Sequence, residues 1–155
     1  GFSISSVITV KARGVPADDI VQILMADYGV ELYGNGVMVN GKFAQENPEV
    51  VRKMLRAINR SIKEAIKNPA AAVDAVLKRN DVARREVEME RFAMVVSQNV
   101  NTDWVKANGI GGIDKARFER AIEQIGLTMT FKNKPKVDDV FTDAFLPPAA
   151  DRKLD

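Results

Sequence analysis

The sequence predicts an α/β protein that is rich in helices and contains a few short strands. Apolar residues recur every three or four positions through much of 48–125, which is the spacing of amphipathic helices. Shorter apolar runs at 20–25 and 36–40 are bounded by glycine and polar residues, as short strands often are. Strand-like segments therefore come early in the chain, and helices come late.

The strongest helix prediction covers residues 48–67. Asn47 precedes Pro48 and Glu49, and this order is typical of a helix start because proline fits the first helical position. Apolar side chains then keep helical spacing as far as Ile66. We therefore expect one helix of about 20 residues here.

Weaker patterns predict several further elements. These are helices at 70–78, about 83–98 and 114–125 (capped by Asp114), a turn at 108–112, a short extended piece at 127–131, and a short helix within 137–148 that is stopped by two prolines.

The two apolar runs predict strands that need neighbours. Residues 20–25 contain one polar residue, Gln22, which suits a strand buried on both faces, as in a parallel sheet. Residues 36–40 predict a second short strand. The chain offers few partners for them and begins at Gly1 without an initiator methionine. We therefore expect a fragment whose sheet lies partly outside this sequence.

Residues 2–14 leave the choice between helix and strand open. Ile4 and Ile8 keep helical spacing, whereas the β-branched content of the segment favours a strand. Gly14 and Pro16 end the element in either case.

The composition excludes several classes of chemistry. The 155 residues contain no cysteine and no histidine, so disulfides, Cys/His zinc sites and His-dependent catalytic triads are excluded. The formal net charge is +2 and no block of Lys or Arg stands out, so we expect no nucleic-acid partner. No apolar run reaches the roughly 18 residues that span a bilayer, and no signal peptide is recognisable. We expect no catalytic residue and no cofactor.

The glycine-rich stretch at 26–40, ADYGVELYGNGVMVN, raises the question of a phosphate-binding loop. The glycines at 34, 36 and 41 do not match G-x-G-x-x-G, because the third comes two positions late. The sequence GKF at 41–43 lacks the hydroxyl residue that follows the lysine of a P-loop. A loop that enters a strand is the favoured interpretation.

Two carboxylate pairs resemble those of Mg²⁺ sites, namely Asp18–Asp19 and Asp138–Asp139. Each pair lies where a helix or strand is expected to begin, and acidic residues at a helix start interact favourably with the helix dipole. Capping and solvation are therefore favoured, and we predict no metal site.

The opening GFSIS is a candidate site for a small ligand. Phe2 and the hydroxyls of Ser3 and Ser5 lie near a possible helix start, where backbone N–H groups can hold an anionic or polar molecule. The simpler interpretation is that Ser3 caps the helix, and spacing alone favours it.

The chain also resembles a known family. The residues that carry the resemblance are Asp27-Tyr28-Gly29, the run Val37–Asn40, ENPEVVRKML (46–55), ANGIGGID (107–114) and VFTDAFLPP (140–148). In their order and spacing the chain is similar to the substrate-binding proteins of nitrate/sulfonate/taurine-type ABC importers. Within that family it most resembles the branch that includes binding proteins for thiamine pyrimidine precursors.

The resemblance implies a fragment of a two-lobed, type II periplasmic binding protein fold. Residues 1–26 would end the second lobe, 27–35 would form the crossing or hinge between lobes, 36–147 would complete the first lobe, and 148–155 would be a tail. By the same resemblance, residues 2–14 form a helix. The glycine-rich stretch is then a hinge, whose glycines and Asn35 permit unusual backbone angles.

The resemblance also implies a function. Such a protein captures a small polar molecule (nitrate, a sulfonate, taurine or a pyrimidine) between its lobes, delivers it to a membrane permease, and works in the periplasm without catalysis. The expected ligand-binding residues are Phe2, Ser3, Ser5, Asp27, Tyr28, Tyr33 and Asn35.

Two alternatives stay open. One is a stand-alone, helix-rich interaction module. The other, less favoured, is a relative of the pyrimidine-synthesising enzymes, whose eukaryotic members use histidine and a cysteine cluster that this chain lacks. A fragment with an incomplete sheet would also expose apolar surface and self-associate.

Overall fold

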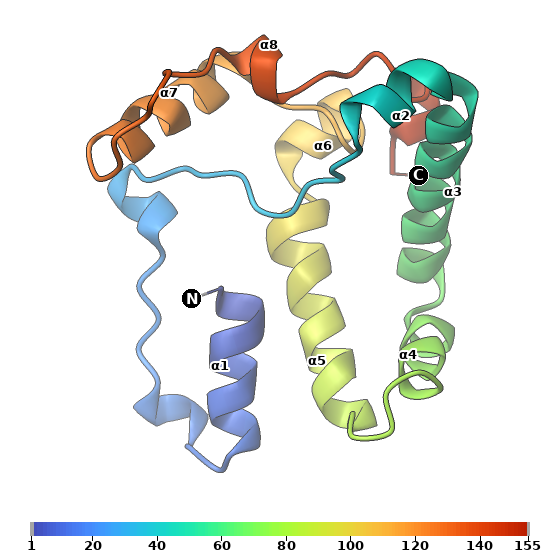
Figure 1. Cartoon of the computed structure of the whole chain (residues 1–155). Helices are drawn as coiled ribbons and strands as arrows, with labels where there is room; N and C mark the ends of the chain where they lie inside the picture. Colours follow the sequence, from blue (N-terminus) through green and yellow to red (C-terminus); the bar gives the residue numbers. More distant parts are fainter. Residues whose placement is uncertain (1, 155) are drawn as a thin grey trace.

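The computed structural model describes residues 2–154, and these form a frame of helices joined by long irregular segments (Figure 1). The helices are α1 (Ser3–Ala12), α2 (Gly41–Glu46), α3 (Pro48–Lys67), α4 (Pro69–Leu77), α5 (Arg85–Val95), α6 (Asp103–Asn108), α7 (Lys115–Gly126) and α8 (Val137–Val140). Short 3₁₀ turns lie at η1 (Ala17–Asp19), η2 (Met25–Tyr28) and η4 (Ala149–Arg152), and a π-helical turn, η3, covers Val96–Val100.

The longest helix, α3, confirms the prediction at both ends. Asn47 is its N-cap residue, but the side-chain amide of Asn47 donates to the carbonyl of Phe43 instead of capping α3. At the other end Asn68 closes α3 and caps α4, since its Oδ1 accepts from the N–H of Ala71. The Asn-Pro pairs thus begin both helices, as proline at the first helical position allows.

The first helix settles the ambiguity at residues 2–14. Figure 1 shows α1 lying antiparallel to α5. Ile8 is buried, with 1% of its surface exposed, and Arg91 Nη1 of α5 donates to the carbonyl oxygen of Ile4 at 2.7 Å. Lys11 and Glu90 form an ion pair between the same two helices. Burial of one face against α5 therefore outweighs the β propensity of the segment.

The predictions of strands at 20–25 and 36–40 are wrong. Within residues 2–154 no β-strand forms, and the side chains of Val21 and Met38 are 85% and 97% exposed. The physical reason is that an extended segment becomes a strand only when a neighbour accepts and donates its ladder of hydrogen bonds. No such neighbour lies within the described part of the chain. The prediction of a helix-rich chain is confirmed, and the sheet of the predicted α/β fold is not formed.

Smaller differences concern the ends of helices. The helix expected at 83–98 is regular only to Val95, after which η3 widens the turn. Residues 127–128 form a turn at the end of α7, and 129–131 form no regular extended piece. The helix expected within 137–148 is limited to α8. Asp114 caps α7 as predicted, because its Oδ1 accepts from the N–H of Arg117 at 3.0 Å.

Two short helices were not predicted, because neither has an apolar period of useful length. Asn40 caps α2 by accepting from the N–H of Phe43, and Thr102 caps α6 by accepting from the N–H of Val105. Asn and Thr before a polar or mixed segment are the signals that could have located both helices.

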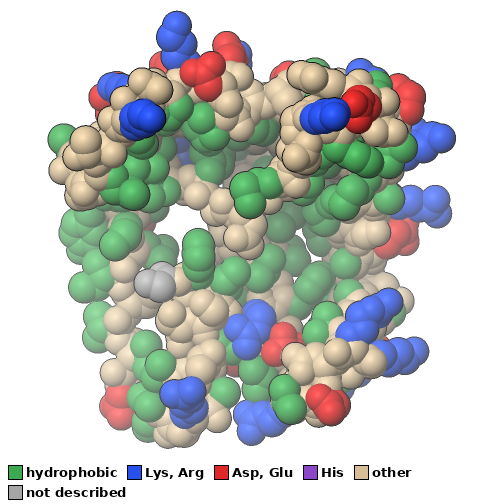
Figure 2. Space-filling view, viewed as in Figure 1, with side chains coloured by type: hydrophobic (Ala, Val, Ile, Leu, Met, Phe, Trp, Pro, Cys, Tyr) green, Lys and Arg blue, Asp and Glu red, His purple; other side chains and the backbone are tan. Residues whose placement is uncertain are grey.

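The chain exposes much more surface than a compact protein of its size. Its accessible surface is 11271 Å², whereas a compact monomer of 17.1 kDa exposes about 7,800 Å². Apolar side chains cover much of the face shown in Figure 2, and an opening lies in its middle. The buried apolar residues are Ile8, Val51, Val73, Ala121, Ile122 and Val137. They are spread over five helices, with only Ala121 and Ile122 sharing one, so the described residues do not close one large core.

Replacement of Ile8 tests the packing of α1 on α5. Ile8→Ala removes buried methyl and methylene groups, so we expect the free energy of unfolding to fall by about 2 kcal/mol or more. The exposed Val10 on the same helix provides the matched control. Val10→Ala should leave stability unchanged or slightly higher, because alanine is the better helix former. Urea denaturation of both variants measures the difference, and equal midpoints would contradict the packing described here.

Candidate functional site

The N-terminal candidates Phe2, Ser3 and Ser5 lie at the start of α1. Phe2 is the N-cap residue and is 62% exposed, and no side chain caps the helix. The hydroxyl of Ser5 donates to the carbonyl of Phe2 at 3.1 Å. The hydroxyl of Ser3 donates to Oε1 of Gln98 at 2.7 Å. The interpretation that Ser3 caps the helix is therefore wrong, because its hydroxyl is used between helices.

The contact with Gln98 places a π-helical turn beside the first candidate residues. Gln98 belongs to η3, where the hydrogen-bond spacing widens directly after α5. Single π-helical turns inside helices are frequently found at functional sites. The sequence predicts a regular helix through this point and so misses Gln98, because no local pattern marks a π-helical turn.

Asp27 and Tyr28 occupy the short turn η2. The turn ends at Gly29, whose φ of 86° lies in the left-handed region that favours glycine. The ring of Tyr28 is 75% exposed, and neither its hydroxyl nor the carboxylate of Asp27 makes a hydrogen bond within residues 2–154. Both side chains are therefore available to a ligand or to another part of the protein.

Tyr33 is placed differently, because it packs on α7. The N–H of Asp114 donates to the Tyr33 hydroxyl at 2.8 Å, and the Tyr33 ring stacks on Phe118 with ring centroids 5.8 Å apart. The guanidinium of Arg117 lies 4.6 Å from the centroid of the same ring, a cation–π distance. Both the ring and the hydroxyl of Tyr33 are thus already used in anchoring the chain.

Residues 29–33 form a strap that is fastened to α7 along its length. Nε2 of Gln124 donates to the carbonyl of Gly29 at 2.6 Å, and Nε of Arg117 donates to the carbonyl of Glu31 at 3.1 Å. Arg120 lies 3.5 Å from the Glu31 carboxylate. Asn35, just beyond the strap, is exposed and has no such contact. The strap fixes the position of Tyr33 and holds the neighbouring η2 close to α7.

The described contacts do not join all the candidates into one site. Ser3 meets Gln98, and Tyr33 meets α7, but no hydrogen bond or ring contact in the described part links the start of α1 with η2 or Asn35. A hollow of about 330 Å³ lies elsewhere, against α3, and none of the predicted residues lines it.

The carboxylate pairs act structurally where they contact other residues. Oδ2 of Asp139 accepts from the N–H of Lys136 at 2.9 Å, as expected of a cap. Asp138 accepts from Lys115 at 2.7 Å, and this hydrogen bond, followed by the Coulomb attraction, raises the pKa of Lys115.

Within residues 2–154 no group of three or more acidic side chains is placed to hold a metal ion, and no helix there is long and apolar enough to cross a membrane.

Comparison with known proteins supports the resemblance seen in the sequence. Residues 2–72 match the model of the family described as NMT1/THI5 like. This match includes α1, η2, the strap and α3, and so it covers all of the candidate ligand-binding residues. The predicted resemblance to the thiamine-precursor branch of substrate-binding proteins is confirmed.

One curated relative extends the similarity along the chain. The riboflavin-binding protein RibY of Chloroflexus aurantiacus is 26% identical over 149 residues, which is 95% of this chain and 41% of the relative. The chain therefore spans about two fifths of the length of that protein. No solved structure matches the chain.

The two tyrosines provide a test of the strap. Tyr33→Phe removes the hydroxyl that accepts from the N–H of Asp114, so we expect a loss of about 0.5–1.5 kcal/mol of stability and faster hydrogen exchange at that amide. Tyr28→Phe removes a hydroxyl without such a partner and should change neither quantity. Equal behaviour of the two variants in amide exchange and in denaturation would contradict the assigned role of Tyr33.

Proposed function

We propose that this chain is part of a solute-binding protein that captures a small molecule for an ABC importer. The observation that carries the proposal is the match of residues 2–72 to the NMT1/THI5-like family model. These residues include the segments at 20–25 and 36–40, where most apolar side chains are exposed. The excess of exposed surface supports the proposal, since roughly 3,500 Å² beyond a compact monomer leaves room for a second part of the polypeptide.

The two-lobed, type II fold with its domain boundaries belongs to this proposal. Residues 1–26 would end the second lobe, 27–35 would cross between lobes, 36–147 would complete the first, and 148–155 would form the tail. The contacts of the strap support a crossing in which one part is held rigidly and another part bends. Residues 29–33 move together with α7, and bending occurs beyond them, near Gly34 and Gly36, where the chain is exposed and makes no side-chain contact.

The ligand would lie between the lobes and contact Phe2, Ser3, Ser5, Asp27, Tyr28 and Asn35. Phe2 and Tyr28 expose aromatic rings that can stack on a planar molecule, and the serine hydroxyls and the Asp27 carboxylate supply polar contacts. Tyr33 would not touch the ligand, and its contacts with α7 would hold the crossing in place. A planar, heteroaromatic ligand such as a flavin or a pyrimidine fits these rings better than nitrate or taurine does.

Delivery to a membrane permease and a periplasmic location follow from the same proposal. A binding protein of this kind closes its lobes by a hinge rotation, and no covalent bond is formed or broken. The absence of histidine and cysteine from these 155 residues argues against the chemistry used by enzyme relatives. The proposal of a stand-alone interaction module is less well supported, since the chain exposes so much apolar surface.

The role of Tyr28 can be tested in the longer polypeptide that we propose contains this chain. Tyr28→Ala removes an exposed ring from the ligand site, so we expect the Kd for its ligand to rise tenfold or more. Titration with riboflavin, followed by quenching of flavin fluorescence, provides the first measurement, with a pyrimidine, nitrate and taurine titrated in the same way by calorimetry.

The control for Tyr28→Ala is Leu127→Ala, another exposed apolar residue that lies at the end of α7. Leu127→Ala should bind like the parent protein. An unchanged Kd for Tyr28→Ala would remove Tyr28 from the site, and no binding of any of the four compounds by the parent would contradict the proposed ligand class.

A further inference from the structure

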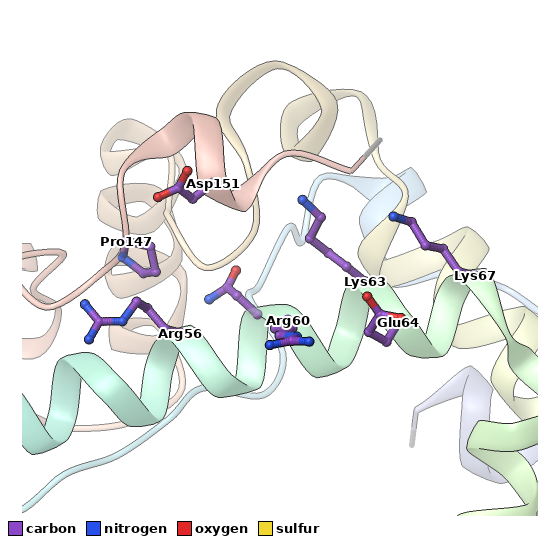
Figure 3. Close-up of a pocket in the computed structure, with 8 residues that line it drawn as sticks. Arg56, Arg60, Lys63, Glu64, Lys67, Pro147 and Asp151 are labelled. Carbon is purple, nitrogen blue, oxygen red and sulfur yellow. The ribbon is translucent and has the colours of Figure 1, made fainter.

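A hollow between α3 and the C-terminal segment lies apart from the residues of the proposed cleft. It has a volume of about 330 Å³, within the range of small-molecule sites. Figure 3 shows α3 forming one wall, while Pro147 and Asp151 face it from the opposite wall. The remaining lining residues are Arg56, Asn59, Arg60, Lys63, Glu64 and Lys67.

The cations recur along one face of α3. Arg56 and Arg60 are four residues apart, and Lys63 and Lys67 continue the same spacing, which places all four along one face of a helix. In the sequence these residues did not stand out, because other residues separate them and only helical spacing brings them together. Their period of three and four is the signal that could have found this site.

The two arginines differ from most basic residues of the chain. Neither Arg56 nor Arg60 forms an ion pair or hydrogen bond within residues 2–154, although both line a hollow. Elsewhere on α3, Arg52 pairs with Glu49 at 2.8 Å. A guanidinium binds a carboxylate or phosphate through two parallel hydrogen bonds, so this pair offers a ready site for an oxyanion.

Asn59 adds a second, independent observation. The residue is buried, with 5% of its surface exposed, and its Nδ2 donates to the carbonyl of Leu55 at 3.0 Å. Its Oδ1 is buried and accepts from no donor within the described residues. A buried acceptor without a donor is costly and is rare in folded proteins. Asn59 lines the hollow, so a bound molecule that reaches Oδ1 as the neighbouring side chains shift would supply the missing donor.

The acidic residues of the hollow point to the same kind of ligand. Glu64 and Asp151 form no ion pair in the described part of the chain, even though cations line the same hollow. Both carboxylates are exposed and solvated, but a bare anion would place negative charge beside them and would leave the buried Asn59 Oδ1 without a donor. A ligand that carries both an oxyanion and an N–H or O–H donor would satisfy charges of both signs.

We propose that this hollow binds a small molecule in which an oxyanion and a hydrogen-bond donor lie close together. Arg56 and Arg60 hold the oxyanion, and Asn59 Oδ1, with Asp151 opposite, accepts from the donor. Protonated phosphate groups and amino acids share this chemistry. The site is separate from the interlobe cleft, so it does not depend on the importer proposal.

Two pairs of simple probes test the requirement for a donor. Inorganic phosphate carries an O–H near neutral pH and sulfate does not, while glycine carries an ammonium group that acetate lacks. Each is titrated into the full chain at constant ionic strength, and the shifts of the Asn59 side-chain amide and of the arginine Nε–H signals are followed by NMR. We expect the donor-bearing member of at least one pair to bind about fivefold tighter or more.

Two sets of variants separate the oxyanion site from general attraction to positive charge. Arg56→Gln with Arg60→Gln should weaken binding of the preferred probe about tenfold or more. Arg13→Gln with Lys53→Gln removes the same charge from residues that do not line the hollow, and binding should stay within twofold. Asn59→Leu should abolish the preference for the donor-bearing probe while leaving anion binding in place.

The probe titrations and the variants together test the proposal and distinguish the two classes of ligand. A preference only for phosphate over sulfate supports a phosphoryl ligand, and one only for glycine over acetate supports an amino acid. Equal binding within both pairs, no binding of any probe, or equal losses in the two double variants would overturn the proposal. Failure of the ligand titrations at Tyr28 would leave these results unaffected.

Discussion

Extended polypeptide must have its backbone N–H and C=O groups paired by a neighbour or solvated, and its apolar side chains need cover. Few apolar side chains in the stretch between residues 20 and 40 are covered in this chain. Val21, Ile23 and Met38, for example, are largely exposed. The helices around this stretch bury single residues such as Ile8 and Val73 instead of one shared core. On the proposal above, a further part of the protein covers this stretch, and the excess surface area is the area that is left exposed without it.

Two sets of contacts limit how this stretch can move. The strap at 29–33 is fastened to α7 through the backbone carbonyls of Gly29 and Glu31 and through the side chain of Tyr33. The start of α1 is fixed to α5 and η3 by Ile8 and by the Ser3–Gln98 hydrogen bond. The exposed rings of Phe2 and Tyr28 each adjoin one of these anchors, which suits a surface completed by another part of the protein. The hollow beside α3 has its own walls and does not share residues with either anchor.

The sequence predicted the elements whose signals are local. The α3 helix and the cap at Asp114 follow from proline, from Asn or Asp caps, and from apolar spacing, and all were placed within about a residue. The segments 20–25 and 36–40 were assigned wrongly because strand formation depends on a partner, which local propensity does not supply. Tyr33 was expected at the ligand, yet its contacts with α7 depend on tertiary packing. Gln98 and the Arg56–Arg60 pair escaped notice because a π-helical turn and a shared helix face become visible only in three dimensions.

The central claim is that residues 20–25 and 36–40 are covered by a further part of a longer polypeptide. Amide hydrogen exchange at Val21, Ile23, Val37 and Val39 tests this most directly, measured in the 155-residue chain and in the longer protein. We predict rapid exchange in the chain alone, because these amides have no described partner, and exchange slowed by at least a hundredfold in the longer protein, about 3 kcal/mol of protection. Rapid exchange in both proteins would contradict the claim, and would favour a chain that works with these segments exposed.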